Sequence, residues 1–426
     1  MKTRELSLRA IDLFAGCGGL SEGFEASGHF SVLAHVEWES APVATLRRRI
    51  EAKGTAPGDA ARSVMRFDMQ RTRDLFKGWK GDPDYGDSVG LDALVREAGG
   101  VDVIIGGPPC QAYSVAGRVR DEHGMHFDYR NYLFETYLAA VKKYRPKAFV
   151  FENVPGMLSA APGGISIVDR IRAGFDQAGY AILGDLSRAA IDLSEYGVPQ
   201  HRTRVIILGI DRKAVADHDQ RLERFYDEIL PSFRRPVMTA GEALGNLPPL
   251  RPAKERYSVA GRRFSHTPHQ TTVADHVPRF HNPRDIETFR MLAEDLRLPP
   301  GRRKFATVQD IHRLYTERTG KVSAVHKYFV IRPDEPSNTI PAHLYKDGLR
   351  HIHWDPAQAR TITVREAARL QTFPDDFDFV GSQSDAYKMI GNAVPPRFAK
   401  ALACAVFEVL RVKSRRSAGT RSERLG

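Results

Sequence analysis

A cysteine that follows a short apolar run is the first residue in this sequence that could do chemistry. Cys110 ends the segment Gly106-Gly107-Pro108-Pro109-Cys110, and the apolar run 101–105 comes directly before it. Such a run predicts a short buried strand, which the glycine and proline residues end abruptly. A thiol just past a strand lies where open α/β sheets bind ligands, so Cys110 is a candidate nucleophile. A structural role is the alternative, and this segment taken alone favours it.

A glycine-rich segment near the start of the chain predicts a binding site for a nucleoside-bearing cofactor. The segment 12–24 follows an apolar run and opens a predicted helix. Its glycines let the backbone turn sharply and approach a ligand, and the free amides of the helix start face that ligand. Glu37 ends the next apolar run, where an acid accepts hydrogen bonds from ribose hydroxyls, and Trp38 could stack on an adenine. The glycine turn alone fits dinucleotides, S-adenosylmethionine or no ligand, and a solvated Glu37 with a rim Trp38 is the alternative.

Joined in order, these segments and four later ones resemble the DNA cytosine-C5 methyltransferase family. Any one of them could arise by chance, but their joint occurrence in this order favours a catalytic Cys110. The segments are 12–24 with Glu37-Trp38, then Gly107-Pro108-Pro109-Cys110-Gln111-Ala112-Tyr113-Ser114, Glu152-Asn153-Val154, Gln200-His201-Arg202-Thr203-Arg204, 363–374 and Gly391-Asn392-Ala393-Val394-Pro395-Pro396.

The resemblance implies a sequence-specific enzyme that transfers a methyl group from S-adenosylmethionine to C5 of a cytosine in duplex DNA. The target base must be rotated out of the stack before the reaction. Cys110 would add to C6 as a thiolate and thereby make C5 nucleophilic. Glu152 would hold or donate a proton at N3, with its pKa raised by burial, and a salt-bridged structural glutamate is the alternative. No residue stands out as the base that removes the C5 proton, and the resemblance suggests an ordered water.

Two arginines on one extended segment complete the implied catalytic set. Arg202 and Arg204 are two residues apart, so we expect their side chains to share one face, with Thr203 on the other. The resemblance implies that Arg204 binds the cytosine O2, and that Arg202 lies close to Cys110 and to the phosphate beside the target. A surface phosphate contact alone is the alternative for either arginine.

The resemblance also implies S-adenosylmethionine as the cofactor, S-adenosylhomocysteine as the product and no metal. Two features depart from the family's pattern, because Phe67 takes the place of the usual glycine before Asp68 and the stretch 70–100 is longer than expected. Cys17 is expected to be a small packing residue. The cofactor residues carried over from the family are Phe14, Gly16, Gly18, Gly19, Leu20, Glu37, Trp38, Asp68, Pro108, Leu133, Asn392 and Val394.

The segment 111–130 is predicted to be a lid that closes on the DNA. It has glycine hinges and basic residues at its tip, although an ordinary connector is the alternative. The predicted DNA-binding residues in it are Gln111, Ser114, Arg118 and Arg120.

The elements that must position these residues indicate an α/β protein. Short apolar runs alternate with amphipathic stretches, which predicts βαβ units and a mostly parallel sheet with helices on both faces. The resemblance implies that this is a Rossmann-like methyltransferase fold with a smaller target-recognition domain. The predicted strands are 8–14, 31–36, 101–105, 148–151 and 205–210, and the predicted helices are 132–143, 168–178, 363–371 and 396–410. The predicted parts are a catalytic domain over 1–212, a target-recognition domain over 213–359, a returning catalytic part over 360–412 and a disordered basic tail over 413–426.

Composition predicts a soluble intracellular protein that is attracted to polyanions, and the resemblance implies a cytoplasmic, nucleoid-associated monomer that binds double-stranded DNA. The 426 residues include three cysteines, carry a formal net charge of +11 and contain no run of membrane-span or signal-peptide length. The stretch 251–305 holds 12 Lys or Arg and 6 acids with interleaved aromatic residues, a mixture that suits phosphate contacts. Histidines 266, 269, 276 and 281 could suggest zinc, but they lack a nearby cysteine and a closed four-ligand spacing, so no metal is predicted.

Two other functions stay open from the sequence. One is a tRNA cytosine-C5 methyltransferase of the same fold, against which the large basic insertion before Thr363 argues. The other is a catalytically silent DNA-binding protein, against which the intact Cys110, Glu152 and Arg204 argue. The recognition sequence, and whether a cognate restriction endonuclease acts separately, are not readable from the sequence.

Overall fold

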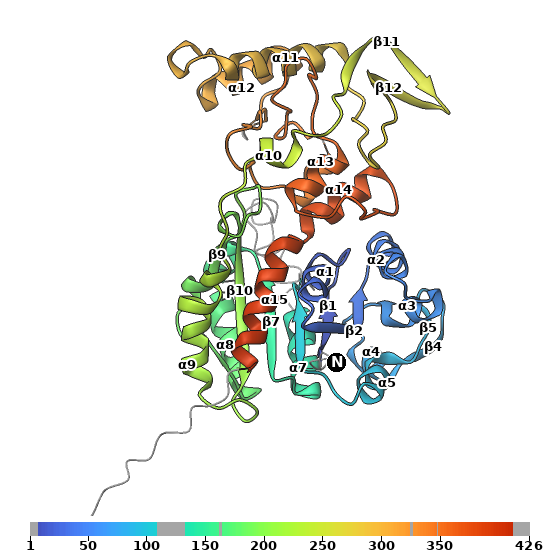
Figure 1. Ribbon diagram of the computed structural model, residues 1–426, viewed down its shortest axis with the longest axis vertical. Helices are drawn as coiled ribbons and strands as arrows, with labels where there is room; N and C mark the ends of the chain where they lie inside the picture. Colours follow the sequence, from blue (N-terminus) through green and yellow to red (C-terminus); the bar gives the residue numbers. More distant parts are fainter. Residues whose placement is uncertain (1–6, 109–132, 162–163, 324–326, 347, 412–426) are drawn as a thin grey trace, which may run out of the picture.

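The central sheet has eight strands and fills the lower half of the molecule (Figure 1). The computed structural model describes residues 7–108, 133–161, 164–323, 327–346 and 348–411. The strand order is β3-β2-β1-β6-β7-β10-β8, with β9 paired to β10, and β10 runs antiparallel to β7, β8 and β9. The predicted α/β class with a mostly parallel sheet is therefore confirmed. The strands are β1 Leu8–Leu13, β2 Phe30–Glu37, β3 Val64–Arg66, β6 Val103–Gly106, β7 Ala148–Asn153, β8 Tyr180–Ile182, β9 Ala190–Asp192 and β10 Thr203–Asp211.

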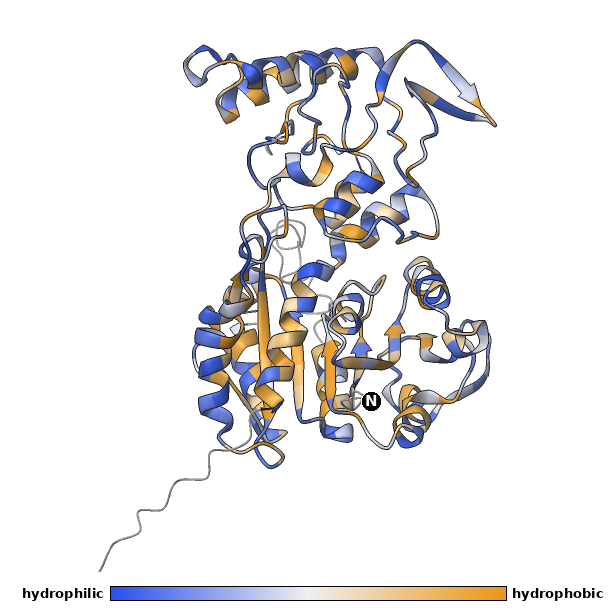
Figure 2. Cartoon of the chain, in the orientation of Figure 1, coloured by the Kyte–Doolittle hydropathy of each residue, from blue (hydrophilic) through white to orange (hydrophobic). Residues whose placement is uncertain are grey.

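The inner strands are apolar because helices cover both faces of the sheet. All four residues of β6 are buried, and β10 is buried from Val205 to its end. Figure 2 shows the same strands as hydrophobic ribbons between helices with polar outer faces. Strands buried on both faces read as continuous apolar runs rather than as alternating ones. This is why the five predicted strands correspond to β1, β2, β6, β7 and β10.

The helices of this half include one from the far end of the chain. Helix α15 packs against α1, and a Cβ on Gly23 of α1 would lie 2.4 Å from Ala399 Cβ. Phe398 and Leu402 of α15 belong to the core of the sheet, as expected for a helix that returns to the first domain. The helices are α1 Gly19–Ala26, α2 Ser40–Ala52, α3 Pro57–Ser63, α4 Thr72–Lys77, α5 Gly90–Glu97, α7 Leu133–Tyr144, α8 Ile167–Gln177, α9 His218–Arg224 with a π-helical extension Phe225–Ile229, and α15 Pro396–Arg411.

The upper half of the molecule contains two smaller hydrophobic cores (Figure 1). One core joins α10 to α13 and α14, and the other lies between α11 and α12. Residues 222–230 still pack on the sheet, so the first core extends past the predicted boundary at 213. The elements are α10 Ala240–Leu244, β11 Arg251–Val259, β12 Arg262–Thr267, α11 Pro283–Arg297, α12 Val308–Thr319, α13 Val364–Leu370 and α14 Gln383–Asn392. Short 3₁₀ helices are Pro155–Ser159, Leu186–Ala189, Leu193–Glu195, Pro231–Phe233, Pro300–Arg302 and Ala342–Tyr345.

The unexpectedly long stretch after Asp68 is an ordered excursion from the sheet. It contains α4, the hairpin of β4 Trp79–Asp82 and β5 Gly86–Ser88, and α5 before the chain enters β6. No helix in the described ranges has both the length and the apolar character that a membrane crossing requires.

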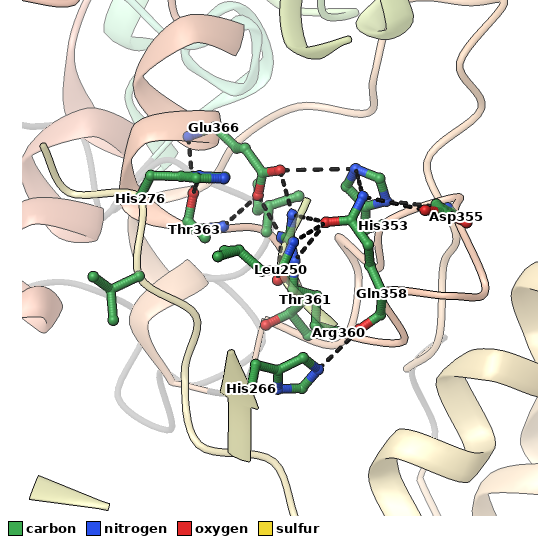
Figure 3. A network of polar contacts seen from close by, with 12 residues as sticks. Leu250, His266, His276, His353, Asp355, Gln358, Arg360, Thr361, Thr363 and Glu366 are labelled. Atoms are coloured by element: carbon green, nitrogen blue, oxygen red, sulfur yellow. Dashed lines mark hydrogen bonds and ion pairs between the residues drawn. The ribbon is translucent and has the colours of Figure 1, made fainter. Parts of the chain in front are cut away.

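A buried ion pair anchors α13 to the upper half (Figure 3). Arg360 donates two hydrogen bonds to the carboxylate of Glu366, at 2.6 and 2.7 Å, and both side chains are 1% exposed. The amide of Thr363 also donates to Glu366, at 2.7 Å, and closes a capping box at the start of α13. Because all these polar groups are paired, the desolvation of the two charges is offset within the network.

Three of the histidines considered for zinc are separate members of the polar packing around this pair. The ring of His266 lies 3.0 Å from Ser265 Oγ and 2.9 Å from the Gln358 carbonyl oxygen (Figure 3). His276 lies between Thr363 Oγ1 and the carbonyl of Pro248, and His281 lies 3.3 Å from the amide of Thr361. Among the described residues, no group of three or more His, Cys, Asp or Glu could hold a metal ion.

These buried histidines should make the folded protein sensitive to acid. Burial lowers the pKa of His266 to about 4 and that of His353 to about 3. An unfolded histidine has a pKa of about 6.5, so below that pH the unfolded chain binds protons that the folded chain does not. We expect the free energy of unfolding to fall between pH 6.5 and pH 4, measured by urea unfolding. His266→Gln should flatten that fall by up to about 1.4 kcal/mol per pH unit, and identical profiles for the two proteins would contradict the prediction.

Candidate active site

The carboxyl ends of the parallel strands and the amino end of β10 meet at one edge of the sheet. Leu13 of β1 pairs with Gly106 of β6, and Gly106 pairs with Phe151 of β7. Since β10 runs the opposite way, its first residues lie beyond Asn153 at the same edge. The strand order reverses between β1 and β6, and open α/β sheets bind ligands at such a switch point. The predicted residues at this edge are Asp68, Glu37, Trp38, Phe14, Pro108, Glu152 and Arg204.

The glycine turn after β1 packs directly against the C-terminal segment. Gly18 has φ of +89° and precedes α1, a left-handed conformation that favours glycine. A Cβ on Gly19 would lie 2.4 Å from the carbonyl oxygen of Val394, so a side chain there would push the two segments apart. The structure thus brings Ala393 and Val394, which follow Asn392 at the end of α14, to the N-terminal turn.

Glu37 holds the turn from the neighbouring strand. Its carboxylate accepts hydrogen bonds from the amides of Gly16 at 2.8 Å, Trp38 at 2.7 Å and Glu39 at 2.9 Å. A carboxylate has about four acceptor positions, so one remains for a ligand hydroxyl. Burial raises the pKa of Glu37. Trp38, whose amide is one of these donors, is 52% exposed.

Asp12 is a buried carboxyl group at this site that was not predicted from the sequence. It lies within β1, is 1% exposed, and its Oδ2 has no hydrogen-bond partner among the described residues. Burial raises its pKa to about 8. A charged residue inside the apolar run Leu8–Leu13 was the available signal, because such a residue is rarely buried without a partner.

The remaining cofactor candidates lie around the same edge. Asp68 follows β3, whose last residues pair with Glu37, and the amide of Phe67 donates to the Glu37 carbonyl at 3.0 Å. Leu133 opens α7 and is 7% exposed. Cys17 is 1% exposed within a hydrophobic core, and burial raises its pKa to about 12. The expectation that Cys17 packs rather than reacts is therefore confirmed.

The segment that leads into the candidate nucleophile begins beside β7. Cys110 and the predicted DNA contacts Gln111, Ser114, Arg118 and Arg120 lie outside the described residues. A Cβ on Gly107 would lie 2.6 Å from Glu152 Oε2, so glycine is needed for this approach. The Asn153 side chain donates to the Pro108 carbonyl at 3.4 Å, and its own oxygen accepts from the Val154 amide at 2.7 Å. Asn153 thus holds the start of the segment against the end of β7.

Glu152 and Arg204 form a direct ion pair at this edge. Arg204 Nε lies 2.8 Å from Glu152 Oε1, and their side chains are 13% and 12% exposed. Burial lowers the pKa of Arg204, with the carboxylate of Glu152 opposing that shift. Arg204 also donates to the Thr203 carbonyl at 2.8 Å. The salt bridge considered as an alternative for Glu152 is present, and its partner is the other candidate for contact with the base.

The side chain of Arg202 is held by main-chain carbonyls. Its side chain is 1% exposed, and its guanidinium donates to the carbonyls of Ile340, Gly391 and Ala393, each at 3.0 Å. Thr203 is exposed, so the two arginines and the threonine do alternate as expected. These contacts tie the start of β10 to the C-terminal segment. The three partners are distant in sequence and could not be identified from the residues around Arg202.

Two buried glutamines extend this connection. Gln200 donates to the Leu370 carbonyl at 2.9 Å and to Gln371 Oε1 at 2.8 Å, and it accepts from the amide of Ile340. Gln371 donates to the Ile390 carbonyl at 2.6 Å. Both side chains are completely buried, so the network links β10, α13 and the segment that reaches the glycine turn.

The chain matches known proteins in sequence over almost its whole length. The signature of the family described as C-5 cytosine-specific DNA methylase matches residues 8–78 and 80–408. The chain is 33% identical to the type II methyltransferase M.Bpa9945I of Bacillus paralicheniformis, over 94% of this chain and 98% of that protein. It is 32% identical to the type II methyltransferase M.AgeI of Thalassovita gelatinovora, over 93% and 98%. It is 29% identical to the DNA (cytosine-5-)-methyltransferase M.ApeKI of Aeropyrum pernix, over 94% and 98%.

Solved structures share the fold. A prophage-encoded E. coli protein described as a DNA modification methyltransferase matches with a TM-score of 0.62 and 23% identity, over 95% of this chain and 100% of that one. The S. pombe Dnmt2 methyltransferase matches with a TM-score of 0.52 and 13% identity, over 96% and 100%.

Proposed function

The chain belongs to the C-5 cytosine-specific DNA methylase family and is a DNA (cytosine-5-)-methyltransferase, and from this premise we propose that it methylates a flipped-out cytosine through a covalent bond between Cys110 and C6. The observation that carries the proposal is the Glu152–Arg204 pair, which lies against the segment leading into Cys110. A proton-holding carboxyl and a cationic hydrogen-bond donor at one point suit the N3 and O2 edge of cytosine.

The residues at the glycine turn fit S-adenosylmethionine, the cofactor on which this family depends. The bound cofactor supplies the methyl group on a positively charged sulfur. The buried Oδ2 of Asp12 has no hydrogen-bond partner among the described residues and could contact a polar group of the ligand near the turn. Glu37 keeps an acceptor position for a ribose hydroxyl, and Trp38 offers its ring to the adenine. Asp68 follows β3, one strand further from the turn, and would accept a hydrogen bond from the amino group of that adenine.

The protein groups at the base site divide the reaction between them. The thiolate of Cys110 adds to C6, while Glu152 supplies a proton to N3 and Arg204 donates to O2. The electron density released to C5 allows that carbon to take the methyl group. Loss of the C5 proton then restores the double bond and expels the thiolate of Cys110, while the N3 proton returns to the carboxylate of Glu152. No described residue is assigned to that proton, in keeping with an ordered water.

The target-recognition domain would be the part of the predicted segment 213–359 that lies beyond the core of the sheet, after residue 230, and its projecting hairpin is a candidate DNA contact. Strands β11 and β12 extend from the upper half as a two-stranded ribbon, a shape that fits the major groove (Figure 1). Residues 251–263 include five Lys or Arg and one acid, and all five basic side chains are exposed. Charge and shape therefore both favour contact with duplex DNA.

Removal of two hairpin charges should weaken DNA binding in a salt-dependent way. We expect K254A/R256A to bind duplex DNA less tightly at low salt, and to flatten the slope of log affinity against log salt by up to about 1.8 through fewer released counterions. Fluorescence anisotropy over a salt series measures both. The control K142A/K213A removes the same charge from exposed sites at the opposite edge of the sheet, so equal slopes for the two variants would count against the hairpin contact.

Bisulfite sequencing of duplex plasmid DNA treated with the purified protein tests the proposed function directly. It reports cytosine methylation and the recognition sequence together, and methylation-free plasmid would overturn the proposal. Competition between duplex DNA and tRNA in a methyl-incorporation assay shows whether DNA or tRNA is the substrate. Since the relatives are type II methyltransferases, the mapped site would also identify the cleavage sequence of a separate cognate endonuclease.

A further inference from the structure

Phe67, which takes the place of the family's usual glycine, is the inner partner of the β4–β5 hairpin. Its ring is completely buried and stacks on Trp79 with centroids 3.8 Å apart and planes at 18°. The Tyr85 ring packs edge-to-face with the Phe67 ring, and their centroids are 5.1 Å apart. A glycine at this position would leave the two hairpin rings without their apolar contact. The unusual Phe67 therefore packs against the unusually long stretch that follows Asp68, through Trp79 and Tyr85.

Arg66 connects the same hairpin to Trp38. Its Nε donates to the Trp38 carbonyl at 3.3 Å, and its Nη1 donates to the Asp84 carbonyl at 3.3 Å. The guanidinium also lies 5.5 Å from the centroid of the Tyr85 ring. One side chain thus joins the main chain beside the candidate adenine-stacking residue to the turn between β4 and β5.

The hairpin is held as a closed unit at both ends. At its tip, Asp82 accepts from the amides of Asp84 and Tyr85, each at 3.0 Å, and from Arg71 at 2.5 Å. At its base, a Cβ on Gly90 would lie 2.2 Å from the amide nitrogen of Gly78, so the two ends of the excursion touch. An isolated two-stranded hairpin is only marginally stable in water, and these contacts supply the missing support.

The position of Asp68 depends on what holds Phe67. The Phe67 amide donates to the Glu37 carbonyl, and the Asp68 carboxylate accepts from the Gln70 amide at 3.0 Å. Between these two bonds, the Phe67 ring is the side chain that sets how the chain leaves β3. We propose that the β4–β5 hairpin positions Asp68 and Trp38 for the adenine of the cofactor, through Phe67 and Arg66 respectively. This inference rests on the proposed function, because it concerns the same cofactor site.

Trp79→Ala in the full-length protein tests the inference. We expect the dissociation constant for S-adenosylmethionine, measured by titration calorimetry, to rise about tenfold, the scale of losing an aromatic pair. The KM for DNA and kcat at saturating cofactor should stay at their wild-type values. Trp79→Phe keeps a stacking ring and should restore cofactor affinity. Lys80→Ala, an exposed neighbour in β4, is the matched control and should change nothing.

A second readout separates positioning from general loss of structure. S-inosylhomocysteine carries a carbonyl in place of the adenine amino group, so an acceptor at Asp68 should make the wild type prefer S-adenosylhomocysteine. Trp79→Ala should reduce that preference, whereas a merely destabilised protein would keep it in its folded fraction. An undiminished preference, or unchanged affinity for both ligands, would overturn the inference.

Asp68→Ala distinguishes failure of the inference from failure of the proposed function. If Asp68→Ala abolishes the preference and Trp79→Ala does not, the hairpin has no positioning role and the assignment of Asp68 survives. If Asp68→Ala leaves the preference intact, the assignment of Asp68 to adenine is wrong and the inference falls with it.

Discussion

We expect Cys110→Ala to abolish methyl transfer and to leave DNA binding intact. Loss of a covalent nucleophile lowers kcat on the order of a millionfold in an enzyme whose other groups act only through it. Incorporation of labelled methyl groups into duplex DNA measures the loss, and anisotropy with the same duplex measures binding. In DNA that carries 5-fluorocytosine, fluorine replaces the C5 proton that must leave before Cys110 is expelled. The wild-type protein should therefore stay covalently bound in a complex that survives denaturing electrophoresis. The variant should form none.

The other thiols provide the control for this result. Cys404 of α15 is half-buried on the helix that packs against α1, and Cys17 is sealed in a core where burial raises its pKa to about 12. A buried neutral thiol is a poor nucleophile. Cys404→Ala should therefore keep both activity and the trapped complex. Turnover near wild type in Cys110→Ala, or a trapped complex that depends on Cys404, would contradict the assignment.

The sequence predicted the sheet well because its inner strands carry their own signal. The apolar runs at β6 and β10 need no alternation, since helices cover both faces. The family resemblance implied that Glu152 and Arg204 act on the same base, but the sequence did not show that β10 runs antiparallel to β7 and so brings Arg204 to Glu152. The contact between Gly19 and Val394 could be expected, because the resemblance assigns both residues to one cofactor site.

Contacts between distant segments could not be predicted in this way. A surface phosphate contact was the alternative for Arg202, yet its side chain is buried and donates to the carbonyls of residues 340, 391 and 393. Nothing local distinguishes an arginine that donates to carbonyls from one that donates to phosphates. The β4–β5 hairpin was missed because 79–88 is polar and glycine-rich without a strand period, and its stability comes from Phe67 outside it.

Glu152→Gln should lower kcat by about 10²- to 10⁴-fold, the range for a group that moves a proton in the transition state. The amide keeps the shape of the carboxyl and can still accept from Arg204, so the fold and the KM for DNA should change little. Single-turnover methyl transfer measures the chemical step. The control is Glu195→Gln, because the Arg234–Glu195 pair has the same 2.8 Å separation but is about half exposed. Exposed pairs of this kind contribute little, and this variant should retain full activity.

The pairing of Glu152 with Arg204 predicts that the effects of changing the two residues on kcat are not independent. If the two side chains act on the same bound cytosine, each single variant should already lose most of what the pair supplies. The double variant E152Q/R204K should then be only slightly slower than the slower single variant. Strictly multiplicative losses would mean that the two groups act independently. In that case Glu152 and Arg204 would be neighbours in the fold without sharing the N3 and O2 edge of the base, and the covalent mechanism would need another proton donor.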